Sequence, residues 1–445
     1  MADSVLDDEA ENFREDLNAG TRRSDKFMLG HFARTVSFIS IALLMPAANA
    51  GAAQNGHPEQ KCNADEIHWT ITGLTSVTFD WRGDEDKIRY GATIGYGQTG
   101  TGNIPKPLPF SSAGPFRQAP LTALTPNALY HYSIGTCPDH TFRTPFPPGS
   151  ANFIIDAEGD IGSSRDYKDV LPVQELIAAH VPAAVLVLGD LSLANPNGQA
   201  SVDQHFNDMM VWSQDVPYMP AWGNHEWDVA RNDDLRNYKG RFGLPNPQTS
   251  PGVPNPGCCG QDWSWFDYGN ARFIAYPEPY TVQTWADWYM KTNRLMDEAQ
   301  RDPNITFIVT FGHRAPFTSG YHHSDLDLRH YIARLAAKHK KYALNVNGHS
   351  HDYERSYPVN GVVSVTAGIG GSELEELNTA CLFRLCPKPS WSAFRAMHFG
   401  ILQLRFTPTV IEGTYICGPG GGGKNDISCT SGSVVDRFTI RAAEK

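Results

Sequence analysis

The stretch "VLVLGDLSLAN" (Val185–Asn195) sets the architecture of the larger part of this sequence. It begins with four apolar residues in a row, which is typical of a strand that is buried on both faces. The run ends at Gly189-Asp190, where a glycine and a carboxylate indicate a turn. Similar runs occur in "NFIIDAEGDIG", "FIVTFGHRAP" and "KYALNVNGHSHDYER". Because helical segments such as "VLPVQELIAAH" separate these strands, we expect α/β layers with polar residues at the carboxyl ends of the strands.

The region before it, residues 58–146, follows a different pattern. Its segments "HWTITGLTSVTFDWRG" and "IRYGATIGYG" alternate apolar and polar residues between glycine turns, which predicts short β-strands. A run of such strands indicates a small β-sandwich. The proline-rich "TPFPPGS" (Thr144–Ser150) predicts a linker. We therefore expect a β-sandwich over 58–146 and an α/β domain over 150–445.

Residues 1–50 are predicted to be a leader that directs export. Basic Arg34 precedes the apolar run 36–45, and Ala48-Asn49-Ala50 forms a small-x-small cleavage pattern. The run is too short to span a bilayer, so we expect a secreted or periplasmic protein without a stable membrane anchor.

The eight cysteines all follow this leader, as expected for an exported chain with disulfides. Cys258 and Cys259 are adjacent, and could bridge each other or pair elsewhere. Proximity in the sequence predicts the other pairs as Cys62–Cys137, Cys381–Cys386 and Cys417–Cys429.

The net charge of −11 argues against a nucleic-acid partner, which would need a basic surface. An anionic substrate remains possible where bound cations reverse the field at one cleft. The glycine-rich "GPGGGGKN" (Gly418–Asn425) is close to a phosphate-binding loop, but Asn425 stands where Ser or Thr would bind magnesium. No amphipathic helix follows it either, so we interpret it as a disulfide-closed loop.

Five turns share one pattern, a glycine next to an oxygen or imidazole donor. Carboxylate, amide and imidazole donors without thiolate suit divalent metals and iron. One such turn alone is usually only a turn, but five of them predict a centre of two metal ions with a bridging carboxylate. The turns are "GDIG" (Asp160), "GDLS" (Asp190), "GNHE" (Asn224, His225), "GHRAP" (His313) and "GHSH" (His349, His351).

The order of these motifs resembles the metallophosphoesterases and, among them, the purple acid phosphatases. "LTPNALYHYSIG" with the following "FRTP" is similar to the fibronectin-III-like domain of the plant-type enzymes. The resemblance implies an N-terminal all-β sandwich (fibronectin-III-like) followed by an α/β four-layer (αββα) metallophosphoesterase domain. It implies the following ligands: Asp160 and His351 for the first metal, Asn224, His313 and His349 for the second, and Asp190 as the bridge.

Three histidines are predicted to be catalytic. His322 and His323, in "GYHH", follow His313 by nine and ten residues. The plant-type enzymes carry a histidine pair at this spacing, which implies contact with the phosphate or protonation of the leaving group. Without that spacing, an adjacent pair would be a surface feature. His225 is a further candidate because it is adjacent to Asn224.

The sequence departs from the family at Leu193, where the purple enzymes have a tyrosine that binds ferric iron. Gly162 likewise stands where broader metallophosphoesterases supply a histidine. Water or Tyr167 could complete the first site. The predicted cofactors are two metal ions, iron, zinc or manganese, with ferric iron disfavoured.

The implied function is hydrolysis of small-molecule phosphate monoesters by metal-bound hydroxide. Two alternatives remain open: a phosphodiesterase with the same two-metal core, or a catalytically decayed, secreted protein that binds metal or phosphate.

Overall fold

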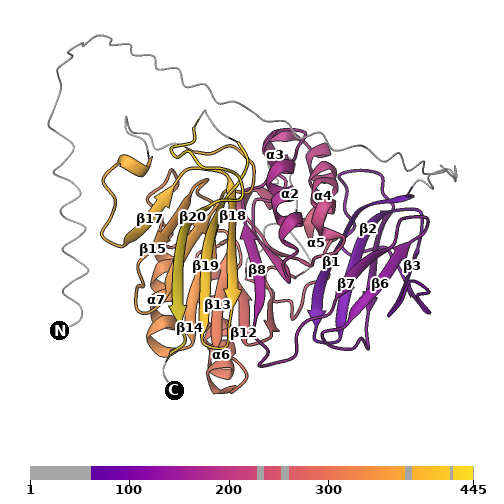
Figure 1. Cartoon of the computed structure of the whole chain (residues 1–445), viewed down its shortest axis with the longest axis horizontal. Helices are drawn as coiled ribbons and strands as arrows, with labels where there is room; N and C mark the ends of the chain where they lie inside the picture. Colours follow the sequence, from indigo (N-terminus) through magenta and orange to yellow (C-terminus); the bar gives the residue numbers. More distant parts are fainter. Residues whose placement is uncertain (1–61, 228–234, 252–259, 376–382, 421–423, 444–445) are drawn as a thin grey trace, which may run out of the picture. The chain divides into compact units, whose positions relative to one another are not determined.

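The computed structural model describes residues 62–227, 235–251, 260–375, 383–420 and 424–443, which all belong to one compact unit (Figure 1). The predicted leader lies outside these residues. Within the described part, no helix has both the length and the apolar character needed to cross a membrane.

The N-terminal part consists of two antiparallel sheets, as the alternating pattern predicts. Between them, the ring of Phe79 lies 5.9 Å from Trp69, 4.6 Å from Tyr132 and 5.2 Å from Phe142, so an aromatic core joins the sheets. One sheet has the order β1-β2-β5 and the other β4-β3-β6-β7. The strands are β1 (Ala64–Gly73), β2 (Ser76–Gly83), β3 (Lys87–Gly91), β4 (Gln98–Thr101), β5 (Phe116–Leu121), β6 (Leu129–Ile134) and β7 (His140–Arg143).

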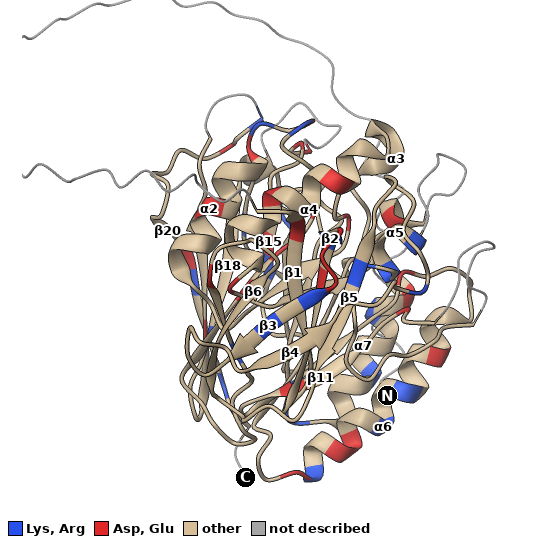
Figure 2. Cartoon of the chain, turned by 90° about the vertical axis from the view of Figure 1, so that its right-hand side faces the viewer, with Lys and Arg blue, Asp and Glu red and all other residues tan. Residues whose placement is uncertain are grey.

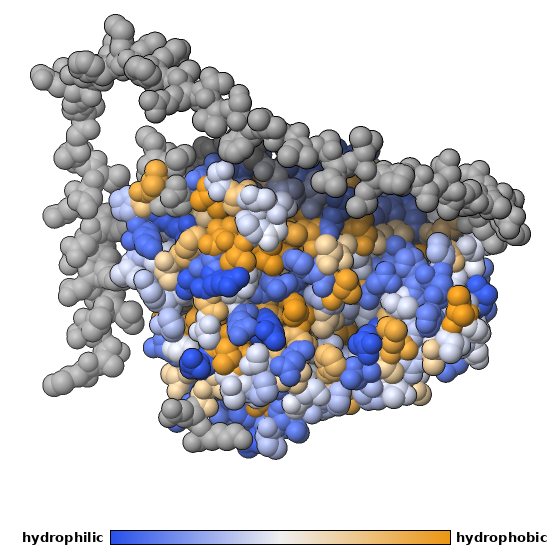
Figure 3. All heavy atoms as spheres, viewed as in Figure 1, coloured by the Kyte–Doolittle hydropathy of each residue, from blue (hydrophilic) through white to orange (hydrophobic). Residues whose placement is uncertain are grey.

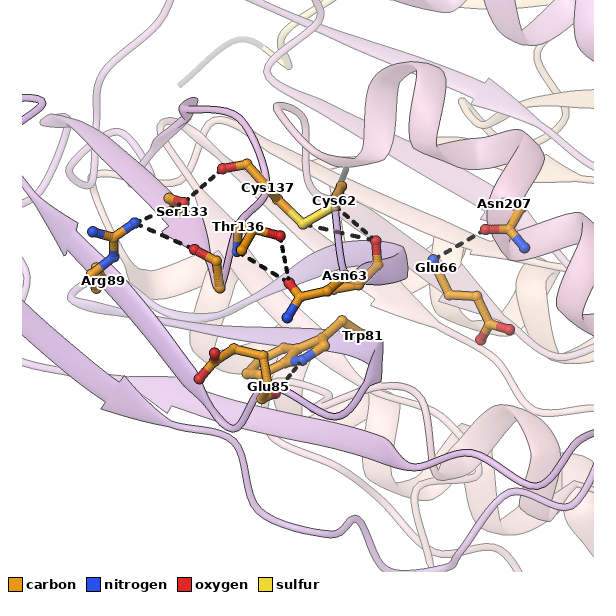
Figure 4. The surroundings of a disulfide bond; sticks show 12 residues. Cys62, Asn63, Glu66, Trp81, Glu85, Arg89, Ser133, Thr136, Cys137 and Asn207 are labelled. Atoms are coloured by element: carbon orange, nitrogen blue, oxygen red, sulfur yellow. Dashed lines mark hydrogen bonds between the residues drawn. A yellow bond between two sulfur atoms is a disulfide. The ribbon is translucent and has the colours of Figure 1, made fainter. Parts of the chain in front are cut away.

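A disulfide between Cys62 and Cys137 ties the start of β1 to the turn between β6 and β7, as Figure 4 shows. Beside it, the Thr136 backbone N–H donates to Asn63 Oδ1 at 3.1 Å. This predicted pair is confirmed.

The pair Cys417–Cys429 is also confirmed. Cys386 is disulfide-bonded, but its predicted partner Cys381 lies outside the described residues, as do Cys258 and Cys259.

The C-terminal part contains two mixed sheets. The first has the order β10-β9-β8-β18-β19-β20, with β8, β9 and β10 parallel. The second has the order β11-β12-β13-β14-β16-β15-β17, with β12, β13, β14 and β16 parallel. The first consists of β8 (Phe153–Glu158), β9 (Ala184–Leu188), β10 (Tyr218–Ala221), β18 (Gly400–Phe406), β19 (Val410–Cys417) and β20 (Val434–Arg441). The second consists of β11 (Trp265–Tyr268), β12 (Ala271–Ala275), β13 (Phe307–Gly312), β14 (Tyr342–Asn347), β15 (Tyr353–Ser356), β16 (Val363–Ala367) and β17 (Ser392–Ala396).

Alternate residues of β9 face different layers. Val185 and Val187 belong to a hydrophobic cluster with Ile177 of the first helix, whereas Leu186 belongs to another with Phe311 of β13. The first sheet is therefore covered by helices on one face and by the second sheet on the other, which gives the predicted αββα order. The helices are α2 (Val170–His180), α3 (Ala194–Asn197), α4 (Ala200–Ser213), α5 (Arg236–Lys239), α6 (Thr284–Arg301) and α7 (Leu326–Lys338), with short 3-10 turns η1 (Asn224–Glu226) and η3 (Phe383–Leu385).

The outer helices are amphipathic. Trp288 of α6 and Leu335 of α7 are buried in the same cluster as Val309 of β13. Figure 2 shows acidic and basic residues together along α6, among them the ion pair of Lys291 with Asp287 at 2.8 Å. The face drawn in Figure 3 likewise mixes hydrophilic residues with small apolar patches.

Polar contacts join the sandwich to the α/β part, in addition to the predicted linker at 144–150. The hydroxyl of Ser213 in α4 donates to the Ile67 carbonyl of β1 at 2.9 Å. Arg82 of β2 pairs with Asp203 of α4 at 2.6 Å. The predicted linker lies between β7 and β8, and side chains hold the parts on either side of it together.

Candidate metal centre

Two parallel neighbours of the first sheet end at the predicted ligands Asp160 and Asp190. Both aspartates adopt left-handed backbone conformations, with φ of 58° and 50°. The Asp160 N–H donates to the Gly189 carbonyl at 3.1 Å, so the two turns are bonded to each other. Such conformations are uncommon for residues other than glycine and occur preferentially at functional sites.

The second sheet supplies His313 after β13 and His349 after β14. The Gly348 N–H donates to the His313 carbonyl at 3.0 Å. The two sheets approach each other closely here, since a Cβ on Gly348 would lie 2.5 Å from Asp160 Oδ2. The missing side chain at position 348 therefore lets ligands from both sheets meet.

The predicted second-metal ligands lie within reach of one ion. His313 Nε2 is 3.2 Å from Asp190 Oδ2 and 3.1 Å from Asn224 Oδ1. His349 Nδ1 is 3.1 Å from His313 Nε2. The donor atoms of Asp190, His313 and His349 all lie within 4.8 Å of one another.

The predicted first-metal ligands form a second such group, Asp160, Asp190 and His351. His351 Nε2 lies 3.3 Å from Asp160 Oδ1. That oxygen is buried and accepts no hydrogen bond of normal geometry from the described residues, so the His351 imidazole is its neighbour of opposite charge. A buried carboxylate oxygen is costly unless a positive charge accompanies it, and a metal ion would supply that charge. Because Asp190 belongs to both groups, its position fits the predicted bridge.

The electrostatics of the cluster also fit cations. Burial lowers the pKa of His313, but the Asp190 carboxylate raises it by a larger amount, so that the pKa is about 9. Burial lowers the pKa of His351 and Asp160 raises it, to about 10. Burial and the neighbouring His313 instead hold the pKa of His349 well below its usual value. Two imidazoles therefore carry protons that metal ions would displace.

The bridging carboxyl itself is ionised. Burial raises the pKa of Asp190, yet His313 and His225 lower it more, so it lies well below the usual range. An anionic carboxylate can bind an ion with each oxygen.

The three predicted catalytic histidines have different surroundings. The His322 ring stacks on His349 with centroids 4.1 Å apart, and its Nε2 lies 3.2 Å from a carboxylate oxygen of Glu375. His323 is exposed. The backbone N–H of His225 donates to an oxygen of Asp190 at 2.9 Å. Of the adjacent pair, the structure therefore brings His322 to the cluster.

The side chain of His225 also contacts its surroundings. Its Nδ1 bonds to Asn195 Oδ1, and its Nε2 is 3.7 Å from Asp190 Oδ2. The ring therefore lies beside the predicted bridge.

Glu226 is a residue of the site that the sequence analysis missed. Its buried carboxylate accepts the backbone N–H groups of Asp190 at 2.8 Å, Leu191 at 2.8 Å and Gly223 at 2.7 Å. It thus holds the turn that carries the predicted bridge and the turn that carries Asn224. The one feature of the sequence that could have indicated Glu226 is its position directly after Asn224 and His225 in the motif "GNHE".

Arg314 and Glu278 were missed as well. Arg314 Nη1 donates to His349 Nε2 at 2.8 Å, and its Nε donates to Glu278 Oε1 at 2.7 Å. The arginine is directly beside His313 in "GHRAP", but the glutamate is distant in the sequence and no motif marks it.

The departures from the family pattern have local explanations. Leu193 is buried, with a left-handed φ of 51°. The Tyr167 hydroxyl accepts from Asn197 Nδ2 at 3.1 Å. A Cβ on Gly162 would lie 2.5 Å from the Tyr167 ring, so the tyrosine fills the space that a side chain at position 162 would need.

A further donor group, His398 with Cys417 and Cys429, does not form a metal site, because its two sulfur atoms are joined in the disulfide.

Comparison with known proteins gives an independent view of this region. Residues 155–353 match the family model for calcineurin-like phosphoesterases. The chain is 24% identical over 393 residues to a probable inactive purple acid phosphatase of Arabidopsis thaliana, with 76% of this chain and 62% of that protein covered. It is 25% identical over 346 residues to a nucleotide pyrophosphatase/phosphodiesterase of Hordeum vulgare, with 68% and 86% covered. This chain therefore spans less than two thirds of the first relative's length.

Solved structures show the same fold. A purple acid phosphatase from yellow lupin (Lupinus luteus) seeds superposes with a TM-score of 0.67 at 19% identity, covering 85% of this chain and 74% of that one. PhoD superposes with a TM-score of 0.60 at 13% identity, covering 87% and 92%.

Proposed function

We propose, from the match of residues 155–353 to the family model for calcineurin-like phosphoesterases, that the protein is a phosphate-ester hydrolase of this kind and that it hydrolyses small phosphate monoesters with two metal ions. The observation that carries the proposal is the convergence of six predicted ligands at the facing edges of two sheets. Asp190 lies in both donor groups, as a bridge between two ions requires.

The donor set suits two divalent cations. Asp160 and His351 would hold the first, Asn224, His313 and His349 the second, with Asp190 between them. When bound, such a pair supplies Lewis acidity to the phosphoryl group and to the attacking water.

The chain's own residues have distinct roles in this proposal. Glu226 fixes the backbone of Asp190. His322 lies across His349 and is the residue best placed to protonate the leaving oxygen, while His225 is held by Asn195 beside Asp190. Positioned proton donors contribute about 10²–10⁴-fold to such reactions.

The metals we propose are zinc, manganese or ferrous iron. Leu193 offers no donor atom, and the Tyr167 hydroxyl is bonded to Asn197. Without a phenolate, the first site lacks the ligand that favours ferric iron in the purple enzymes and keeps the carboxylates of Asp160 and Asp190 and the imidazole of His351. We also propose export, which the two disulfides of the described part support.

The comparisons favour phosphodiester hydrolysis as the second candidate, since the barley relative is named a nucleotide pyrophosphatase/phosphodiesterase. The names of two Arabidopsis relatives, each a probable inactive purple acid phosphatase, keep the decayed-enzyme alternative in view. The six predicted ligands that lie together, with His322 stacked on His349, speak against decay.

The test combines elemental analysis with turnover of a phosphomonoester and a matched diester, p-nitrophenyl phosphate and bis-p-nitrophenyl phosphate. We expect two metal ions per chain and faster hydrolysis of the monoester. Faster diester hydrolysis would favour the second candidate. Two bound ions without hydrolysis of either compound would mean a binding protein.

A further inference from the structure

We propose that Arg314 is an anion-binding side chain of this centre and that it takes a phosphoryl oxygen of the substrate. The inference rests on the proposed function, because it names a phosphate-binding residue of the same site. The inference adds a phosphate-binding residue, because Arg314 is neither one of the six predicted metal ligands nor one of the three predicted catalytic histidines.

Arg314 is held on one edge and partly open on the other. The Tyr276 hydroxyl donates to the Arg314 carbonyl at 2.7 Å, which fixes its backbone beside His313. Glu278, whose side chain is 0% exposed, accepts both Nε and Nη2 on a single oxygen. The Arg314 side chain itself is 26% exposed. The guanidinium is therefore oriented by a buried carboxylate and still reaches solvent.

The edge of the Arg314 guanidinium that Glu278 does not hold faces His349, a predicted metal ligand. Nη1 donates to His349 Nε2 at 2.8 Å, while His349 Nδ1 lies on the side of His313 and the second-metal group. A guanidinium nitrogen can only donate, so this contact requires a lone pair on Nε2.

Metal binding and this hydrogen bond exclude each other. An imidazole that binds a metal through Nδ1 carries its remaining proton on Nε2. With such an ion bound, His349 Nε2 and Arg314 Nη1 would both be donors, and the bond between them would be lost. Glu278 would still hold Nε and Nη2, so Nη1 would be available at the edge of the second-metal group.

The chemistry of the released group fits a phosphate. A planar guanidinium that is always charged and held by its opposite edge presents N–H donors in a fixed direction, and charge-assisted bonds to phosphate oxygens are among the strong ones. The alternative is a purely structural ion pair that braces the turn after β13. The two can be separated, because a structural pair would affect stability but not the affinity for an anion.

The test measures binding of inorganic phosphate to the metal-loaded protein by calorimetry. Removing the arginine alone would leave Glu278 buried and unpaired, so the main variant is the double Arg314→Gln/Glu278→Gln, which keeps two polar partners. We expect its Kd for phosphate to rise about 10–100-fold with an unchanged metal content by elemental analysis. Arg314→Lys keeps the charge without the fork, and we expect an intermediate Kd.

The control is Arg301→Gln at the exposed end of α6, which should leave the phosphate Kd unchanged. A wild-type phosphate Kd in the double variant and in Arg314→Lys, with metals retained, would overturn the proposal. If the double variant does not fold, the Kd of Arg314→Lys decides. Failure of the proposed function would show differently, as a lack of phosphate-ester turnover by the wild-type protein, which the binding measurement does not use.

Discussion

Asp190 combines a left-handed backbone, a buried anion and membership of two groups of predicted metal ligands in one residue. Its φ of 50° is maintained because Glu226 accepts its backbone N–H. Its Oδ2 faces His313 of the second sheet, while its Oδ1 accepts the backbone N–H of His225.

Asp190→Asn should lower metal content and turnover together, because an amide offers one neutral oxygen where the bridge needs two anionic ones. Elemental analysis and phosphomonoester kinetics on the folded variant give the measurement. Full metal stoichiometry with normal turnover would show that another residue bridges the ions.

His322→Ala should lower kcat about 10²-fold with the metals retained, because His322 stacks on a predicted ligand without belonging to either donor group. His323→Ala is the matched variant, and we expect a smaller effect from this exposed neighbour. Wild-type kinetics in both single variants and in the double variant would show that the histidine pair is a surface feature without a catalytic role.

Leu193→Tyr should restore some ferric iron binding and a visible charge-transfer band, since a phenolate would re-enter the first site. Leu193 is only 3% exposed, so we expect the larger ring to cost about 1–3 kcal/mol in the free energy of unfolding. The wild-type protein loaded with iron is the control. A visible band in that control, with one ferric ion per chain, would mean that another residue supplies the phenolate.

Individual residues of the site differ in how far the sequence could predict them. The aspartates and histidines stand in glycine turns after apolar runs, so their places at the ends of strands could be predicted, and their role as metal ligands stays a prediction. Glu226 acts on backbone N–H groups and Glu278 on an arginine far along the chain, and neither partnership leaves a local pattern.

At the level of elements, the apolar runs predicted β8, β9, β13 and β14, whose ends carry the ligands. The sequence did not predict how closely the two sheets approach. That distance depends on glycines in the turns that follow strands of the two sheets. A Cβ on Gly159, after β8, would lie 3.5 Å from the Cα of Gly348, after β14. A pattern along one strand carries no information on the strand facing it.

Gly348→Ala tests this approach. The added Cβ would lie 2.5 Å from Asp160 Oδ2, so it should displace the carboxylate and weaken metal binding at least about 10-fold without unfolding the protein. Gly95→Ala is the control, since its Cβ would meet only an ordinary contact at 3.6 Å. Calorimetric zinc titration of both variants provides the measurement, and equal affinities would refute the steric argument.

At the scale of the whole molecule, the boundary predicted at 144–150 falls between β7, which ends at Arg143, and β8, which begins at Phe153. The contacts between the strands before it and the α/β layers come from residues far apart in the sequence. Arg241 pairs with Glu66 and Asp203 at 2.9 Å each, and these two acids lie in different parts of the fold. Composition shifts reveal a linker, but they do not reveal such an interface.

His205 of α4 should make the folded protein sensitive to acid. Its Nδ1 donates to the Gly162 carbonyl at 2.8 Å and its Nε2 accepts from the Tyr218 hydroxyl at 2.9 Å, which suits a neutral ring. Burial lowers its pKa to about 4. Its contribution to stability is complete above the unfolded value of about 6.5 and is lost as the pH falls towards 4.

Over that range the free energy of unfolding should fall by roughly 3 kcal/mol from this group alone. Urea unfolding at pH 7.5 and pH 5 captures about 2 kcal/mol of this loss, which should be smaller in His205→Gln and unchanged in the exposed control His330→Gln. An identical pH dependence in His205→Gln and the wild type would contradict the assignment.

In the proposed two-metal centre, the shared Asp190 has a consequence for any attempt to add or remove one ion at a time. Two sites that use one carboxylate would be thermodynamically linked, so each ion would change the affinity for the other by the same factor. A chelator that withdraws one ion thereby also alters the retention of its neighbour. Reconstituted preparations should therefore be judged by the paired occupancy of both sites, since neither has an affinity of its own that holds across loading states.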